Sequence, residues 1–303
     1  MMDKDYKEEN MKNTSKFDKT VLAINKVMLV MAVLIILVPL IYVFIASFMN
    51  PNTLLSKGIS FNPSDWSLAG YKKIFEDPAI VRGFFNSIIY SALFTIISVG
   101  VSVCAAYPLS RKEFVGRKVI MGMFMVTMFF SGGLIPTYLL IKNLGMLNTV
   151  WALVIPGAVS VWNIILARTF FQSIPNEIIE AAGIDGASTW QIFLKIILPL
   201  SKPIICVLAL YAFVGQWNSY FDAMIYLKDS NLEPLQLVLR RILIQNQPSQ
   251  GMISDQLAMA ELKKISEMIK YSSIVISSVP LMFMYPFFQK YFEKGVMIGS
   301  VKG

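Results

Sequence analysis

Residues 180–203 read EAAGIDGASTWQIFLKIILPLSKP and lie between two stretches that are apolar enough to span a bilayer. This polar interruption contains two acids, Glu180 and Asp185, and two glycines, Gly183 and Gly186, before an apolar run begins. Glycine lets a chain turn through backbone conformations that other residues resist. A loop that only reversed the chain would not need so ordered a pattern. The stretch therefore predicts a docking element that a soluble partner protein binds.

The chain as a whole has the composition of a membrane protein. Of its 303 residues, 55% are hydrophobic and 15% are charged, and the mean hydropathy is +0.60, which is too apolar for an ordinary soluble domain. A helix of about 20 mostly apolar residues crosses the hydrocarbon core of a bilayer. We therefore predict an all-α integral membrane protein with six transmembrane helices. The charge-free runs that predict them are Val27–Asn50, Phe84–Ser110, Val119–Ile141, Asn143–Ala167, Ile204–Phe221 and Tyr271–Gln289.

Residue types that carry out catalysis are scarce. The chain has no histidine, which excludes histidine-based acid–base chemistry and histidine metal sites. Its two cysteines, Cys104 and Cys206, fall inside predicted spans, where thiols act as small packing residues rather than as a disulfide framework. No cluster of acids, bases or metal ligands falls at membrane depth. We therefore expect a protein that is not an enzyme.

The basic residues predict the orientation in the membrane. The connection after the second run carries Arg111, Lys112, Arg117 and Lys118, whereas the connection after the third carries only Lys142. By the positive-inside rule the first of these connections is cytoplasmic. The net charge of +8 is accordingly interpreted as a topology signal and not as a nucleic-acid-binding surface. With six spans, both termini are expected in the cytoplasm.

This topology divides the chain into a long membrane domain and two short tails. Inside the outer loop that follows the fifth span, apolar residues recur at helical spacing and predict an amphipathic helix, which packs against the spans or contacts a partner. The apolar positions of that helix are Ala258, Leu262, Ile265 and Ile269. The predicted boundaries are a cytoplasmic tail 1–26, a membrane domain 27–292 with a cytoplasmic loop 172–203 and external loops 51–83 and 228–270, and a cytoplasmic tail 293–303.

The third and fourth runs contain residues that disrupt helices. Ser131–Gly133 and Pro136 lie in the third run, and Pro156 and Gly157 lie in the fourth. Broken backbone at membrane depth survives only where neighbouring helices or a water-filled cavity satisfy its polar groups. Close helix packing through small residues uses the same residue types. The sequence leaves packing and a transport pathway as equal alternatives.

The 172–203 loop itself is predicted to contain two short helices. Pro175 suits the first turn of the first helix, and Glu177 and Glu180 complement its positive N-terminal end. Ser188 is suited to cap the second helix, which has one apolar side. Such a loop fits insertion into a cleft of a partner, although an elbow lying on lipid headgroups remains an alternative.

The loop residues also carry a resemblance to a known family. The pattern E-A-A-x-x-D-G-A-x(5)-F-x-x-I-x-L-P is matched without a gap from Glu180 to Pro199, and it resembles the cytoplasmic loop of permease subunits of bacterial ABC importers. Asn86-Ser87, Trp217-Asn218 and the tail from Gln289 to Gly303 are similar to carbohydrate-uptake permeases, in particular to the second permease subunit of maltose-like systems and its oligosaccharide branch.

The resemblance implies a division of labour among several subunits. The permease carries no catalytic site and no cofactor, because ATP and Mg²⁺ are held by a dimer of ATP-binding subunits. Closure of that dimer moves the loop and switches a pair of permease subunits between inward-open and outward-open states, and an external binding protein delivers the sugar. The implied location is the bacterial cytoplasmic membrane. The coupling residues implied are Glu180, Ala181, Ala182, Asp185, Gly186 and Ala187, and tail residues Ser300, Val301, Lys302 and Gly303 are implied to contact the ATPase.

The sequence points less specifically to a substrate path. Trp217, Asn218, Tyr220 and Asp222 at the end of the fifth run combine the aromatic and amide groups that suit sugars, but they also suit interfacial anchors and a solvated acid. The adjacent Arg240–Arg241 pair would attract acidic sugars or simply be solvated.

The sequence leaves three other functions as alternatives. An importer of a non-sugar solute fits Trp217-Asn218 and the tail less well. A secondary transporter would need acids within the membrane to bind its coupling ion. A receptor that only docks a cytoplasmic protein would explain the Glu180 loop but not the broken third and fourth spans.

Overall fold

The computed structural model describes residues 16–245, 266 and 269–289. Within these ranges the chain is helical and contains no strand, apart from one isolated bridge between Met49 and Trp66. The elements are α2 (Lys16–Ser47), α3 (Pro51–Lys57), η1 (Pro63–Asp65), α4 (Ala69–Glu76), α5 (Pro78–Ser110), α6 (Arg117–Phe129), α7 (Leu134–Asn143), α8 (Trp151–Val154), α9 (Val161–Gln172), α10 (Asn176–Ile184), α11 (Thr189–Ile192), the π-helical η2 (Phe193–Ile197), α12 (Leu198–Leu200), α13 (Lys202–Trp217), α14 (Phe221–Tyr226), η3 (Ser230–Leu232), α15 (Leu235–Gln245) and a further helix, Ile269–Gln289.

Three of the described helices are long and apolar enough to cross a membrane. They are Phe17–Ser47, Pro78–Ser110 and Ile269–Gln289, and they contain most of the first, second and sixth runs that the sequence predicts as spans. Asp77 caps the second of these helices by accepting a hydrogen bond from Ala79 N at 2.8 Å, and Pro78 occupies its first position.

The remaining predicted spans are not continuous helices. The third run breaks between α6 and α7 with a bend of 112°, at Gly133, whose φ of +85° lies in the left-handed region that glycine tolerates. The fourth run is divided into α8 and α9 by non-helical residues 155–160, which include Pro156. Helices Thr189–Leu200 and Lys202–Trp217 also meet at 77°. With each bent pair counted as one span, the described residues contain up to five candidate spans, and a span over the fourth run stays a prediction.

The chain separates into two compact units, and the first comprises Met1–Tyr71 with Asp255–Val275. In this unit the side chains of α2 are exposed from Phe17 to Tyr42. The C-terminal end of α2 is held by the Ser47 hydroxyl, which lies 2.7 Å from the Tyr71 hydroxyl. An apolar helix exposed to this extent is suited to lie in lipid or against another subunit.

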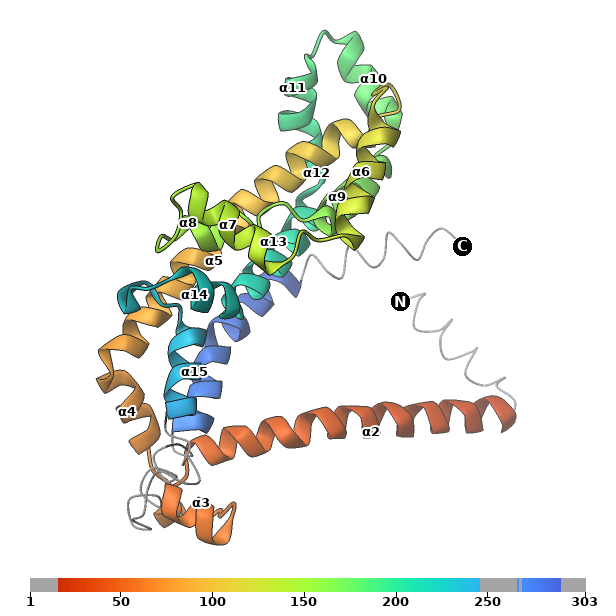
Figure 1. Cartoon of the computed structure of the whole chain (residues 1–303). Coiled ribbons are helices and arrows are strands. Elements are labelled where there is room, and N and C mark those ends of the chain that lie inside the picture. The colour runs from red at the N-terminus through yellow and green to blue at the C-terminus, as the bar shows by residue number, and fades with distance from the viewer. Residues whose placement is uncertain (1–15, 246–265, 267–268, 290–303) are drawn as a thin grey trace. The chain divides into compact units, whose positions relative to one another are not determined.

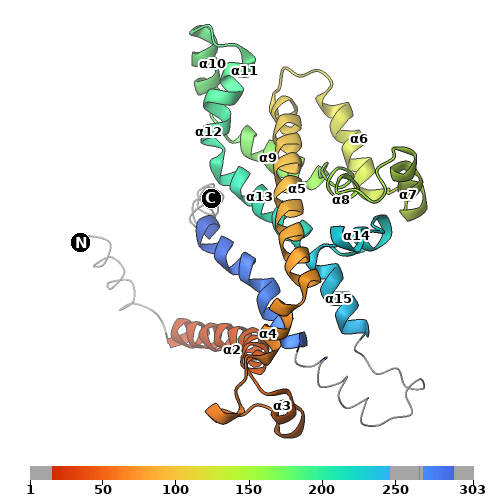
Figure 2. The ribbon, with the colours of Figure 1, turned by 90° about the vertical axis from the view of Figure 1, so that its left-hand side faces the viewer.

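The second unit comprises Lys72–Ser254 with Ile276–Gly303, and α5 runs through its length (Figures 1 and 2). Helices α9, α13 and α15 pack along α5. Five serines of α5 are buried, and such small residues let helices approach closely. The buried serines are Ser87, Ser91, Ser98, Ser102 and Ser110.

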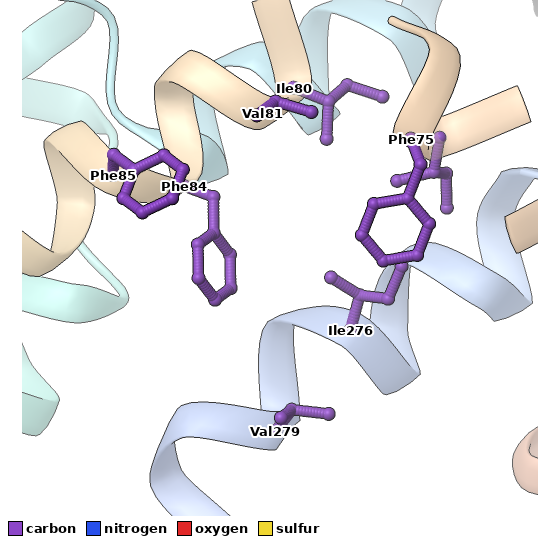
Figure 3. A pocket seen from close by; sticks show the side chains of 8 residues that line it. Phe75, Ile80, Val81, Phe84, Phe85, Ile276 and Val279 are labelled. Carbon is purple, nitrogen blue, oxygen red and sulfur yellow. The ribbon is translucent and has the colours of Figure 1, made fainter. Parts of the chain in front are cut away.

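An apolar cavity of about 240 Å³ lies in the second unit between α4, the start of α5 and the last helix (Figure 3). Phe75, Phe84 and Phe85 line it together with aliphatic side chains such as Ile276 and Val279. A sugar hydroxyl placed there would find no side chain to hydrogen-bond. The cavity is therefore unsuited to be part of a sugar path.

Candidate functional site

The 172–203 loop forms two helices that meet at an acute turn at one end of the second unit (Figures 1 and 2). Helices α10 and α11 are joined by residues 185–188. The predicted pair of short helices is therefore present. Pro175 precedes the first helical residue and serves as the N-cap, one position earlier than predicted.

The end of α10 is closed by two backbone hydrogen bonds, and Gly186 is the residue there with a left-handed backbone conformation. Gly186 has φ +78°, and its N–H donates to Gly183 O at 3.1 Å. The Ala187 N–H donates to Ala182 O at 2.9 Å. This pair of bonds is the Schellman motif, which needs a left-handed residue at the position of Gly186. Gly186 therefore supplies the predicted bend, whereas the prediction that Gly183 also turns the chain is wrong, because Gly183 lies inside α10.

The start of α11 is closed by a capping box. The Ser188 hydroxyl accepts from Gln191 N at 3.3 Å, and the Gln191 side chain accepts from Ser188 N at 2.8 Å. This confirms Ser188 as the predicted cap. The backbone groups at the end of one helix and at the start of the next are thus satisfied within a few residues, which makes the turn stiff.

The tip of the loop presents both charge and apolar surface. Glu180, Ala181 and Asp185 are exposed, whereas Ala182 is partly buried. Ile184 is 87% exposed, which is unusual for so large an apolar side chain. Sequence reasoning missed Ile184, although an isoleucine between the two glycines of the turn was a readable signal. An apolar side chain beside acids at a stiff turn is suited to a protein–protein contact.

The loop is connected to the interior of its unit by buried side chains of α11 and η2. Ile192, Phe193 and Ile197 are buried in the main apolar core. The Phe193 ring lies 4.8 Å from the Tyr107 ring of α5, centroid to centroid. The loop is therefore packed against α5, and its second helix, Thr189–Leu200, leads to α13 across the 77° bend.

Basic residues lie beside the base of the loop. Arg111 and Lys112 line a cavity of about 170 Å³ with Gln172 and Asn176. The Arg111 guanidinium also lies 4.9 Å from the centre of the Tyr107 ring. The basic turn after α5 and the 172–203 loop are thus at the same end of the second unit.

Trp217 is buried rather than open to a path. Its exposed fraction is 0%, and its indole N–H donates to Ser277 O at 3.0 Å. Phe84 meets the indole edge to face at 5.7 Å, and Phe213 stacks on it at 6.1 Å. These contacts favour a packing role for Trp217 over the predicted substrate contact.

The other three predicted path residues are exposed. Asn218 ends α13, and its amide donates to Val214 O at 2.9 Å. Tyr220 and Asp222 lie at the junction with α14. Partial burial raises the pKa of the Asp222 carboxyl above its ordinary value. Tyr220 and Asp222 thus remain accessible, whereas Trp217 does not.

The segment that follows, residues 218–245, is anchored to α5 by side chains far away in sequence. Asn86 donates to Asn231 O at 2.8 Å and to Glu233 O at 3.1 Å, and the Ser87 hydroxyl accepts from Leu235 N at 2.8 Å. Tyr90 donates to Leu232 O at 3.0 Å. Asn86-Ser87, quoted above only for its resemblance, therefore holds the 218–245 segment in place.

Helix α15 was not predicted from the sequence. Leu235, Val238 and Leu239 are buried, at the i, i+3, i+4 spacing of an amphipathic helix, and this spacing was the signal available. The backbone of Leu235 passes so close to Gly83 that a Cβ there would lie 3.2 Å from it. The predicted amphipathic helix around Ala258 and the tail Ser300–Gly303 lie outside the described residues, except for Ile269, which is buried.

The two adjacent arginines of α15 have different environments. Arg241 forms an ion pair with Glu233, with Nη1 2.9 Å from Oε1. The Arg240 guanidinium lies 4.6 Å from the centre of the Tyr220 ring, and its Nη1 lies 3.0 Å from Met224 Sδ. The solvated pair considered from the sequence is thus wrong for Arg241, which has a carboxylate partner.

Comparison with known proteins identifies the family. Residues 9–298 match the family described as binding-protein-dependent transport system inner membrane component. The chain belongs to this family. Its members are transport permeases, so this membership confirms the family that the loop motif predicts and the location in the membrane.

Individual relatives cover almost the whole chain. The polygalacturonan/rhamnogalacturonan transport system permease protein YtcP of Bacillus subtilis (strain 168) is 40% identical over 275 residues, 91% of this chain and 96% of the relative. Protein LplC of the same organism is 39% identical over 274 residues, 89% of this chain and 90% of the relative. A crystal structure of a bacterial ABC transporter involved in the import of the acidic polysaccharide alginate contains a chain with 31% identity and a TM-score of 0.81, covering 92% of this chain and 99% of that chain. The protein therefore has the fold of an ABC-importer permease.

Proposed function

We propose that this chain is a permease subunit of an ATP-driven, binding-protein-dependent importer of oligosaccharides. The observation that carries the proposal is the stiff α10–α11 turn with its exposed acids and Ile184, in a chain of this family. The saccharides named for the relatives supply the class of cargo. The partners are a second permease subunit, a dimer of ATP-binding subunits and an external sugar-binding protein.

In this proposal the chain crosses the membrane six times and has both termini in the cytoplasm. The shared position of the basic turn and the 172–203 loop supports this orientation, because the positive-inside rule puts both on the cytoplasmic side. The broken third and fourth runs then border the translocation path, where protein or water satisfies their free backbone groups.

The mechanism is mechanical rather than chemical. Closure of the ATP-binding subunits pushes the α10–α11 turn, and the buried side chains of α11 and η2 transmit the displacement to α5 and α13. Glu180 makes a charge-assisted hydrogen bond to a basic residue of the ATPase. Ala181 and Ala182 give this face a low profile, and Asp185 to Ala187 form the bend. The tail Ser300–Gly303 contacts the ATPase as well.

The test is purification of the complex from the host membrane, followed by an ATPase assay. We expect a second permease and an ATPase to co-purify, and the loaded binding protein to stimulate hydrolysis. Glu180→Lys should abolish this stimulation and leave assembly intact. Glu177→Lys is the matched control, because it makes the same charge change on the same exposed helix. If both variants lost the stimulation equally, Glu180 would have no specific contact with the ATPase. Its role would then be to stabilise the N-terminal end of α10, an effect of about 0.3–1 kcal/mol.

A further inference from the structure

Arg240 is a partly exposed cation. Its guanidinium rests on Tyr220 and touches Met224, and among the described residues no carboxylate lies within 4.0 Å of it. The neighbouring Arg241 is neutralised by Glu233. Two arginines of the same helix therefore differ in what they can still bind.

The position of Arg240 is also rigid. Helix α15 packs closely against Gly83 of α5, and Asn86, Ser87 and Tyr90 hold the residues just before it. A side chain on an anchored helix, resting on an aromatic ring, loses little conformational freedom when it binds a ligand. The ligand would meet a group that is already in place.

The chemistry of this arrangement selects carboxylates. A guanidinium lying over a ring keeps N–H donors in its own plane free, and that planar fork matches a carboxylate in a bidentate manner. Exposed Tyr220 adds an aromatic surface of the kind that binds sugar rings. Arg240 and Tyr220 lie in the part of the second unit that carries α14 and α15, away from the α10–α11 turn (Figures 1 and 2).

We propose that Arg240, supported by Tyr220, binds the carboxylate of a uronic-acid residue of the transported saccharide and so makes this importer specific for acidic oligosaccharides. This inference rests on the proposed function. The relatives' names agree with it, since alginate is an acidic polysaccharide and polygalacturonan is a polymer of a sugar acid. Arg241, bound to Glu233, has no such role.

The experiment compares two ligands whose carboxyl groups are either free and charged or esterified and neutral. The complete importer with its binding protein is reconstituted in proteoliposomes and supplied with an oligogalacturonide or with its methyl ester, in which the carboxylates are blocked. Arg240→Gln should raise the oligogalacturonide concentration for half-maximal uptake by about ten-fold or more, as expected when a charged hydrogen bond is lost. Uptake of the ester and the basal ATPase activity should not change.

Arg241→Gln is the matched control and should not alter the preference between the two ligands. The proposal would be overturned if Arg240→Gln reduced the uptake of both ligands equally, or if it reduced the uptake of neither. If the wild-type importer takes up no saccharide, the proposed function fails. Binding by Arg240 is then tested separately by saturation-transfer NMR of oligogalacturonide with the purified complex. The wild-type complex should bind the oligogalacturonide, and the Arg240→Gln complex should not.

Discussion

The 172–203 loop and the 218–245 segment are built in different ways. The hydrogen bonds of the α10–α11 turn join residues three to five positions apart, as in Gly186 to Gly183 and Ala187 to Ala182. Those that anchor the 218–245 segment to α5 join residues more than 140 positions apart, as in Asn86 to Asn231 and Ser87 to Leu235. The first region carries its own geometry in its sequence, whereas the second takes its geometry from α5.

The largest effect on uptake is expected at the turn. Gly186→Pro fixes φ near −65° where the turn needs +78° and removes the N–H that donates to Gly183. We expect uptake to fall by ten-fold or more, with ATP hydrolysis retained and normal amounts of protein in the membrane, because even an ordinary residue in the left-handed region costs roughly 1–2 kcal/mol.

Gly183→Ala is the control for this variant, because Gly183 is helical and no atom lies within 4 Å of the Cβ it would gain. Uptake and quantitative membrane blots of both variants decide the outcome. Loss of Gly186→Pro from the membrane, or equal uptake in the two variants, would contradict a coupling role for the bend.

Trp217 tests whether the C-terminal end of α13 belongs to the core or to a substrate path. Trp217→Ala should lower the free energy of unfolding by about 3–5 kcal/mol, because it leaves a large buried cavity and removes the indole hydrogen bond to Ser277 O. Thermal unfolding of the purified complex measures this loss. A stable variant with altered saccharide preference would instead restore Trp217 to the substrate path.

A smaller effect is expected where the 218–245 segment is anchored. Ser87→Ala removes the acceptor of the buried Leu235 N–H, at a cost of about 1–3 kcal/mol. Hydrogen exchange of residues 231–240 should become faster while the α10–α11 turn stays unchanged. Ser173→Ala, at an exposed serine, is the control. Faster exchange in both regions would show that they are not independent.

The smallest effect is expected at the capping box. Ser188→Ala should destabilise the start of α11 by about 0.5–2 kcal/mol and speed hydrogen exchange there. The 218–245 segment should not respond. A response of the distant segment alone would refute the local origin of the turn's stiffness.

These differences explain what the sequence could predict. Gly186 and Ser188 were identified correctly because their roles depend on near neighbours. Apolar runs predicted the long helices for the same reason, since length and hydropathy are local properties. The residues of the substrate path were harder to predict, because the burial of Trp217 depends on Phe84 and Ser277, which are distant in sequence.

Helix α15 and Arg240 show the same limit. Residues 228–270 were expected to be an external loop whose helix begins near Ala258, yet α15 forms at Leu235–Gln245 because its apolar side packs on α5. Arg240 and Arg241 differ because one rests on Tyr220 and the other pairs with Glu233. Two consecutive arginines in the sequence do not predict this difference. Residues 246–265 and 290–303, which include the predicted tail contact, lie outside the described residues.

The most direct test of coupling is saccharide uptake by proteoliposomes that contain the purified complex, measured with and without ATP in the compartment of the ATP-binding subunits. Uptake should require both ATP and the loaded binding protein, and should be lost in Glu180→Lys but not in Glu177→Lys. Uptake by this chain alone, driven by an ion gradient without ATP, would contradict the proposed function and would make Asp222 the first candidate for binding the coupling ion.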